Sequence, residues 1–233
     1  MISRKSEFRL FDRGFKDNIV LIPGWATDYR IFLKLNLNYN YVLPIQFYPF
    51  DFEKRLLKYL DKISAGKVLL FGWSLGGFSA TDFALKNSQR VSKLILLSIR
   101  KGYHSQELKE IELKLKRNRK AYLYRFYLEC FSSYDKEGLG WFKENLLKRY
   151  ISEMKLEDLL CGLDYLSNAK LHLEFLASVQ KLRIFHGKED KIAPLKEAIE
   201  IKSRLPCAKF TCFSNLGHVI FLNSEFTEKF HNG

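Results

Sequence analysis

The chain lacks the long apolar run that a membrane-spanning helix requires. None of its 233 residues belongs to a stretch approaching the ~18 consecutive apolar residues that cross a bilayer. The first fifteen residues carry basic side chains but no apolar segment of the kind found in a secretory leader. These features predict a cytoplasmic protein that does not bind membranes.

Cysteine is also scarce, and acidic residues are outnumbered. Cys130, Cys161, Cys207 and Cys212 match no paired metal-ligand spacing, so we expect free thiols, no metal site and no cofactor. The 39 Lys and Arg residues exceed the 26 Asp and Glu residues by 13. Such a surplus attracts nucleic acid, anionic lipid or an acidic protein, unless a lysine-rich composition is simply tolerated. The absence of a recognised nucleic-acid motif disfavours the first of these partners.

No repeat, low-complexity tract or Pro/Gly/Ser linker divides the chain, which has the length of one domain with an inserted lobe. Its two ends contain short apolar runs without polar alternation, as is typical of strands buried on both faces. These runs are Ile19–Ile22, Tyr41–Ile45, Val68–Phe71, Leu94–Ser98, Leu182–Phe185 and Lys209–Phe213. Helix-like segments lie between several of them, at Phe52–Ile63, Phe78–Asn87 and Pro194–Arg204. The alternation predicts an α/β fold with a mostly parallel sheet covered by helices on both faces.

Strand signals vanish over residues 101–180. Ser105 is placed to cap a long helix that runs to about Glu129, and further helices are expected around Trp141–Met154 and Leu156–Leu166. An apolar stripe marks one side of the long helix, formed by Leu108, Ile111, Leu115, Tyr122 and Phe126. We therefore predict an α/β core from residues 1–100 and 181–233, with residues 101–180 forming a helical cap over a site.

The sequence Gly72-Trp73-Ser74-Leu75-Gly76 stands between a predicted buried strand and a predicted helix. Glycines two positions either side of a serine permit a very sharp strand-to-helix turn, which projects the hydroxyl above the sheet. A tight turn with an incidental serine is the alternative, and the flanking strand and helix disfavour it. Ser74 is thus a candidate nucleophile, which requires a base and an acid that orients the base.

Candidates for both partners follow later strands, at the edge where such sheets build their sites. Asp190 lies just beyond Leu182–Phe185, and His218 lies just beyond Lys209–Phe213, which gives the chain order Ser, Asp, His. Glu189 is the nearest rival acid. The other histidines are less well placed, being His104, His172, His186 and His231.

An oxyanion hole requires two backbone N–H groups. We expect one from Leu75, directly after the nucleophile, and the other from Trp25, which follows Pro23-Gly24 after an early strand. Trp25 could equally be a packed aromatic residue, and the two roles are compatible.

Together these motifs resemble the α/β-hydrolase superfamily over nearly the whole chain, with Pro23-Gly24 in place of the frequent His-Gly. The segments PGWATDYRIF and GWSLGG look like those of the pimeloyl-[acyl-carrier protein] methyl ester esterases of biotin synthesis. Arg125-Phe126 match that family's cap, although Glu129 and Cys130 stand where a glutamine is expected. LEDLLCGLDYLSN, residues 156–168, resembles its last cap segment.

The resemblance implies a monomeric serine carboxylesterase that removes the methyl ester of a carrier-bound pimeloyl chain. It implies substrate contacts by Trp25, Trp73 and Phe126. It also implies an acidic acyl-carrier protein as partner, which a basic cap would attract. The docking candidates are Lys116, Arg117, Arg119, Lys120, Arg125, Lys148 and Arg149, with a solvated helix face as the alternative.

Two rival functions remain open on the same scaffold. One is another hydrolase with the same triad: a general small-ester esterase, a thioesterase or a carbon–carbon bond hydrolase. The other is a non-catalytic binding protein, which the combination of Ser74, Asp190 and His218 disfavours.

Overall fold

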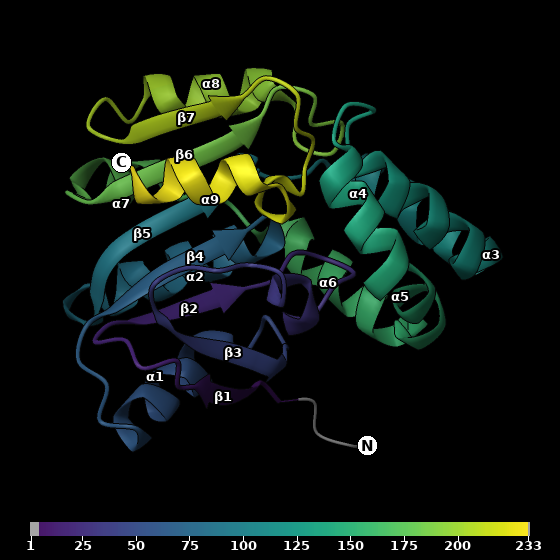
Figure 1. Ribbon diagram of the computed structural model, residues 1–233. Coiled ribbons are helices and arrows are strands. Elements are labelled where there is room, and N and C mark those ends of the chain that lie inside the picture. The colour runs from purple at the N-terminus through teal and green to yellow at the C-terminus, as the bar shows by residue number, and fades with distance from the viewer. Residues whose placement is uncertain (1–4, 233) are drawn as a thin grey trace.

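A seven-stranded sheet forms the centre of the computed structural model, which describes residues 5–232 (Figure 1). The strands are arranged in the order β1-β3-β2-β4-β5-β6-β7, and all neighbouring pairs are parallel except β1 with β3. Their bounds are β1 Glu7–Phe11, β2 Asn18–Ile22, β3 Asn40–Gln46, β4 Val68–Trp73, β5 Val91–Leu97, β6 Leu182–Gly187 and β7 Lys209–Phe213. The predicted α/β fold with a mostly parallel sheet is confirmed.

Each of the six predicted strands is present, with ends that shift by up to three residues. The prediction omitted β1, an edge strand with the sequence EFRLF whose residues are all at least partly exposed. It pairs antiparallel with β3, and its polar residues alternate with apolar ones. An alternating edge strand has no continuous apolar run, and therefore the criterion that found the buried strands could not find this one.

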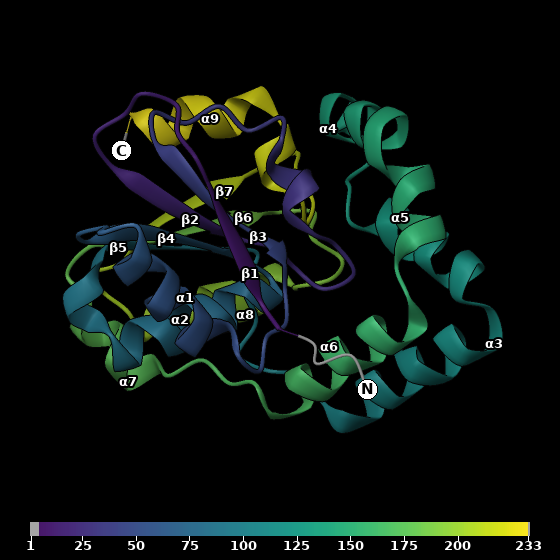
Figure 2. The ribbon, with the colours of Figure 1, turned by 90° about the horizontal axis from the view of Figure 1, so that it is seen from below.

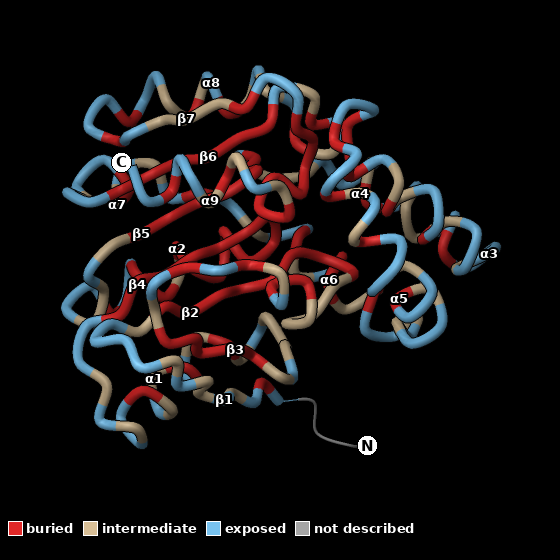
Figure 3. Tube along the Cα trace, viewed as in Figure 1, coloured by how far each residue is buried: buried red, intermediate tan, exposed pale blue. Residues whose placement is uncertain are grey.

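Helices cover both faces of the sheet, as predicted. Figure 2 shows α9 (Ser224–His231) on one face and α1 (Phe52–Lys62) with α2 (Leu75–Lys86) on the other, while α8 (Leu195–Ser203) packs on β6. Short 3-10 turns complete the core at η1 Tyr29–Phe32, η2 Ser88–Arg90 and η4 Ile220–Leu222. Figure 3 shows the buried positions concentrated in the central strands. Burial of these strands on both faces explains their continuous apolar sequences.

All remaining helices lie between β5 and β6, where the sequence predicted a helical insertion. They are α3 Ser105–Glu129, α4 Lys136–Phe142, a π-helical turn Lys143–Leu147, α5 Lys148–Glu153, α6 Leu156–Asn168 and α7 Leu173–Ser178. In Figure 1, α3 to α6 stand beyond the carboxyl ends of the parallel strands. This is the edge at which open α/β sheets place their ligands.

The long helix α3 differs from its prediction in two ways. Ser105 is its first helical residue, and the capping position belongs to His104, whose side chain makes no capping bond. Asn118 has non-helical angles (φ −157°, ψ 87°), and its side-chain oxygen accepts a hydrogen bond from the Ala121 N–H at 3.0 Å. Asn118 therefore caps the second half of α3, so that the predicted single helix is two helices joined at a kink.

The other inserted helices also begin or end differently. The predicted helix around Trp141–Met154 starts earlier, because Asp135 accepts a capping hydrogen bond from the Gly138 N–H at 2.9 Å. The short α7 was not predicted. No helix within residues 5–232 is long and apolar enough to cross a membrane.

The turn from β4 into α2 brings the start of α2 against the end of β2. A Cβ atom added at Gly76 would lie only 2.3 Å from the Ile22 carbonyl oxygen, whereas one added at the α4 residue Gly140 would meet nothing within 4 Å. Replacing Gly76 by alanine must therefore displace backbone, and backbone does not give way easily.

We expect Gly76→Ala to lower the free energy of unfolding by roughly 3 kcal/mol, as overpacking of a rigid site does. The matched control Gly140→Ala should raise it by about 0.5–1 kcal/mol, because alanine is the better helix former. Urea denaturation of both variants measures the difference. Equal stabilities would contradict this account of the turn.

Candidate active site

Ser74 lies at the junction of β4 and α2 in a strained backbone conformation. Its φ of 54° and ψ of −120° fall in a region that residues with a Cβ rarely adopt, and its N–H donates to the Leu97 carbonyl oxygen at 2.9 Å. Such strain persists only where the surrounding structure imposes it, and it is concentrated at functional sites. Its position before the first turn of α2 also places it beside the positive end of the helix dipole.

Asp190 and His218 meet at the carboxyl ends of β6 and β7. His218 Nδ1 lies 2.8 Å from Asp190 Oδ2, and both side chains are buried. The other carboxylate oxygen, Oδ1, accepts the N–H groups of Ile192 and Ala193, each at 2.8 Å. Burial alone would raise the pKa of Asp190, but the nearby His218 and these hydrogen bonds lower it below its ordinary value. The carboxylate is thus held ionised and fixed in direction.

The backbone of His218 is held as firmly as its ring. Its N–H donates to the Cys130 carbonyl oxygen at 2.7 Å, which ties the loop to the end of α3. Its carbonyl oxygen accepts the Trp73 indole N–H at 2.9 Å and the Ser98 hydroxyl at 2.8 Å. The sequence did not predict that Ser98 and Cys130 bind the His218 backbone, because these contacts join segments that are distant in the chain.

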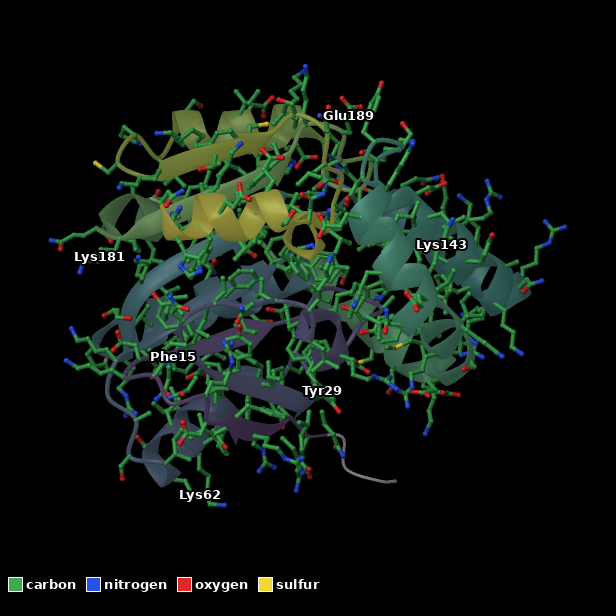
Figure 4. All side chains as sticks on the ribbon, in the orientation of Figure 1. Phe15, Tyr29, Lys62, Lys143, Lys181 and Glu189 are labelled. Carbon is green, nitrogen blue, oxygen red and sulfur yellow. The ribbon has the colours of Figure 1, made fainter. Side chains whose placement is uncertain are left out.

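The rival acid and bases lie in other surroundings. Glu189 sits in the outer loop after β6 (Figure 4), and its N–H donates to the Leu216 carbonyl oxygen. His186 is fully buried, with Nε2 at 2.8 Å from the Ala193 carbonyl oxygen and 3.7 Å from Asp190. Burial lowers the pKa of His186, which favours a neutral ring. His104 and His172 lie beside the inserted helices, and His231 ends α9.

Ser74 opens into a cavity of about 210 Å³ between the sheet edge and the inserted helices. The cavity is lined by Trp25, Ser74, Tyr103, Glu107, Leu108, Glu110, Ile111, Lys114, Tyr122, Phe126, Glu129, Leu163, Leu166, Lys191 and Ile192. Tyr103 lies in this lining beside Ser74, and burial raises the pKa of its phenol to about 12, so the phenol stays neutral. The walls are thus largely apolar and aromatic, with charged groups from α3 and from Lys191 in the loop after β6.

Two of the three residues expected to contact substrate line this cavity. The Trp25 indole packs edge-on against Phe126, with ring centroids 5.0 Å apart, and donates its N–H to the Leu159 carbonyl oxygen at 2.9 Å. Trp73 does not line the cavity: only 2% of it is exposed, and it packs against Phe221. The Trp73 indole N–H donates to the His218 carbonyl oxygen, and the expected contact of Trp73 with substrate stays a prediction.

The loop that carries Trp25 lies directly against the serine. A Cβ atom added at Gly24 would lie 3.1 Å from the Ser74 Cβ and 3.0 Å from the Trp73 ring, which explains the glycine. Leu75 is the first residue of α2, so its N–H has no carbonyl partner within the helix. The backbone segments that contain the two candidate oxyanion donors thus both approach Ser74.

The basic residues proposed from sequence lie on α3 and α5, outside the cavity lining. Two of them pair within their own helix, Lys116 with Glu112 and Arg149 with Glu153 at 3.2 Å. Arg119 is partly buried, and the others are exposed: Arg117, Lys120, Arg125 and Lys148. Lys114, which was not among the docking candidates, is the α3 cation that reaches the cavity.

The four cysteines, all within the described residues, form no disulfide bond with one another. Within residues 5–232, no cluster of three or more His, Cys, Asp or Glu side chains could hold a metal ion.

Because Asp190 has a lower pKa in the folded state than in the unfolded chain, its charge contributes stability above the ordinary carboxyl pKa of about 3.9. That contribution is lost as the pH falls through the folded value. We therefore expect the difference in unfolding free energy between wild type and Asp190→Asn to shrink from pH 6 to pH 3. Denaturant titrations at each pH measure it. Asp164→Asn, at an exposed position on α6, is the control, and a pH-independent difference for Asp190→Asn would contradict the assignment.

A family model described as the alpha/beta hydrolase fold matches residues 23–225. The chain is 25% identical over 252 residues to a pimeloyl-[acyl-carrier protein] methyl ester esterase of Vibrio parahaemolyticus, covering 96% of this chain and 95% of the relative. It is 26% identical over 235 residues to a 2-hydroxy-6-oxononadienedioate/2-hydroxy-6-oxononatrienedioate hydrolase of Paraburkholderia phymatum, covering 94% of this chain and 74% of that protein.

Among solved structures, an esterase from Exiguobacterium antarcticum superimposes with a TM-score of 0.81 at 20% identity, covering 97% of this chain and 95% of that chain. This likeness confirms the fold, in agreement with the strand order and with the inserted helices after β5. The family match covers most of the chain and includes the segments that carry Ser74, Asp190 and His218. The protein therefore belongs to the α/β-hydrolase family.

Proposed function

We propose that this protein is a serine esterase in which Ser74 is the nucleophile, His218 the base and Asp190 the acid that orients the base. The buried contact between His218 Nδ1 and Asp190 Oδ2 at 2.8 Å carries the proposal, because it directs Nε2 of the ring away from the carboxylate. The strained elbow that presents Ser74 to a mainly apolar cavity supports the nucleophilic role. Residues 101–180 act as the cap that encloses this cavity.

In the first half-reaction, Ser74 Oγ attacks the ester carbonyl carbon while His218 Nε2 takes the hydroxyl proton. The N–H groups of Trp25 and Leu75 bind the oxyanion that develops. Collapse of the intermediate breaks the bond to the alkoxide, which leaves as an alcohol after His218 returns the proton. In the second half, His218 deprotonates a water that attacks the acyl-enzyme, and Ser74 leaves with that proton. One ester and one water thus give one acid and one alcohol.

For the substrate, we propose the methyl ester of a pimeloyl chain carried by acyl-carrier protein, which yields methanol and serves biotin synthesis. The similarity to the Vibrio parahaemolyticus enzyme over nearly the full length of both chains supports this choice. The aromatic walls formed by Trp25, Tyr122 and Phe126 suit a methylene chain. The exposed cations of α3 and α5 would attract an acidic carrier.

A carbon–carbon bond hydrolase is the second candidate, supported by the similarity to the Paraburkholderia phymatum enzyme. The two activities require different substrates and are separated by direct assay. Release of methanol from the carrier-bound methyl ester favours the esterase. Cleavage of 2-hydroxy-6-oxononadienedioate without ester hydrolysis would favour the alternative.

We expect Ser74→Ala to lower ester hydrolysis by at least about a thousandfold, because removal of a triad member removes the nucleophilic pathway. The measurements are methanol release and the growth without biotin of cells that lack their own pimeloyl-ester esterase. A fluorophosphonate should label wild type at Ser74, identified by peptide mass spectrometry, and leave the variant unlabelled. Restored growth with Ser74→Ala would refute the catalytic assignment.

Carrier docking predicts a charge effect confined to the carrier-linked substrate. The double change Arg117→Glu and Lys120→Glu, at exposed positions of α3, should lower kcat/KM for that substrate about tenfold at low salt. It should leave hydrolysis of a small free methyl ester unchanged. The control is Lys58→Glu with Lys62→Glu on α1, where Figure 4 shows Lys62 far from the inserted helices. An equal loss on the free ester would count against docking.

A further inference from the structure

His218 lies in the loop between β7 and the turn η4, outside regular secondary structure. Its carbonyl oxygen nevertheless has two hydrogen-bond donors, the indole N–H of Trp73 at 2.9 Å and the hydroxyl of Ser98 at 2.8 Å. All three residues are no more than 2% exposed. These bonds form away from water, where a polar group left without a partner is costly.

Both donors lie at the carboxyl ends of β4 and β5, the two strands that also position Ser74. Trp73 is the last residue of β4 and directly precedes Ser74, while Ser98 follows β5. The Ser74 N–H binds the Leu97 carbonyl oxygen, and the Ser98 N–H binds the Phe185 carbonyl oxygen at 3.0 Å. The peptide of the base is therefore attached to the sheet beside the nucleophile, without using the reactive side chain of either residue.

Ser98 has a backbone conformation that favours glycine. Its φ of 50° lies in the left-handed region, which costs a residue with a Cβ roughly 1 kcal/mol and which glycine adopts freely. Glycine would relieve the strain but supply no donor to His218. Ser98 combines the strained backbone with a hydrogen bond that glycine could not make.

We propose that Trp73 and Ser98 are positioning residues, which hold the His218 carbonyl so that the imidazole stays aligned between Asp190 and Ser74. The proposal rests on the esterase function above. In this proposal, Trp73 of the Gly72–Gly76 segment orients the base and does not contact the substrate.

Two donors on one carbonyl make the contributions of Trp73 and Ser98 interdependent. Loss of either leaves the oxygen paired with the other, whereas loss of both leaves a buried carbonyl without a side-chain donor. The loop must then shift to find a new partner, and a small displacement of the ring is expensive in rate. The effects of the two substitutions should therefore exceed additivity when combined.

The test uses Trp73→Phe, Ser98→Ala and the double variant, each of which removes a donor with little loss of volume. We expect kcat on a short-chain nitrophenyl ester to fall about threefold to fivefold in each single variant and about a hundredfold in the double variant, with KM within about twofold of wild type. The rate of Ser74 phosphonylation by a fluorophosphonate should fall in parallel, since that reaction also needs the base. Trp141→Phe and Ser92→Ala are matched controls outside these contacts.

A further variant separates orientation from general damage to the fold. Ser98→Gly removes the hydroxyl while relieving the left-handed strain, so Trp73→Phe with Ser98→Gly should lose as much activity as Trp73→Phe with Ser98→Ala, with the thermal unfolding midpoint of each protein measured alongside. Additive losses, or losses that appear in KM alone, would overturn the positioning role while wild type still labels at Ser74. Wild type that fails to label at Ser74 would overturn the esterase function and this inference together.

Discussion

The buried contact between Asp190 and His218 is the interaction on which the rest of the site depends. An ionised carboxylate in the protein interior is expensive unless its oxygens are paired. Here one oxygen faces the imidazole and the other accepts two backbone N–H groups of the loop after β6. The loop after β6 therefore stabilises the charge of the Asp190 carboxylate and also fixes the orientation of that carboxylate toward His218.

The inserted helices contribute to this arrangement as well as covering it. The Cys130 carbonyl at the end of α3 accepts the His218 N–H at 2.7 Å, and a Cβ at Gly217 would lie 2.8 Å from that carbonyl oxygen. The same helix supplies Tyr122 and Phe126 to the cavity wall. One element therefore shapes the cavity at Ser74 and restrains the loop that carries His218, so the proposed substrate site and the proposed base depend on the same helix.

Charge is distributed unevenly between the site and the surface. The cavity is lined by Glu107, Glu110 and Glu129 together with Lys114 and Lys191, so its own walls are mixed in sign. The residues that give the net charge of +13 therefore lie mainly on outer surfaces, including the exposed positions of α3 and α5. The field of the excess positive charge therefore acts mainly at the outer surface, where it attracts anions.

The sequence by itself determined the buried strands, the order of the helices around them and the candidate residues Ser74, Asp190 and His218. Apolar runs report burial on both faces, and glycine spacing reports a sharp turn, so both are local signals. The alternating edge strand β1 and the kink at Asn118 were missed because one lacks a continuous apolar run and the other depends on a side-chain cap. Only the tertiary structure decided that Trp73 faces the His218 backbone and that Ser98 and Cys130 reach the same loop. These contacts join residues 88 to 145 positions apart, and no periodicity along the chain encodes which distant carbonyl a buried donor will meet.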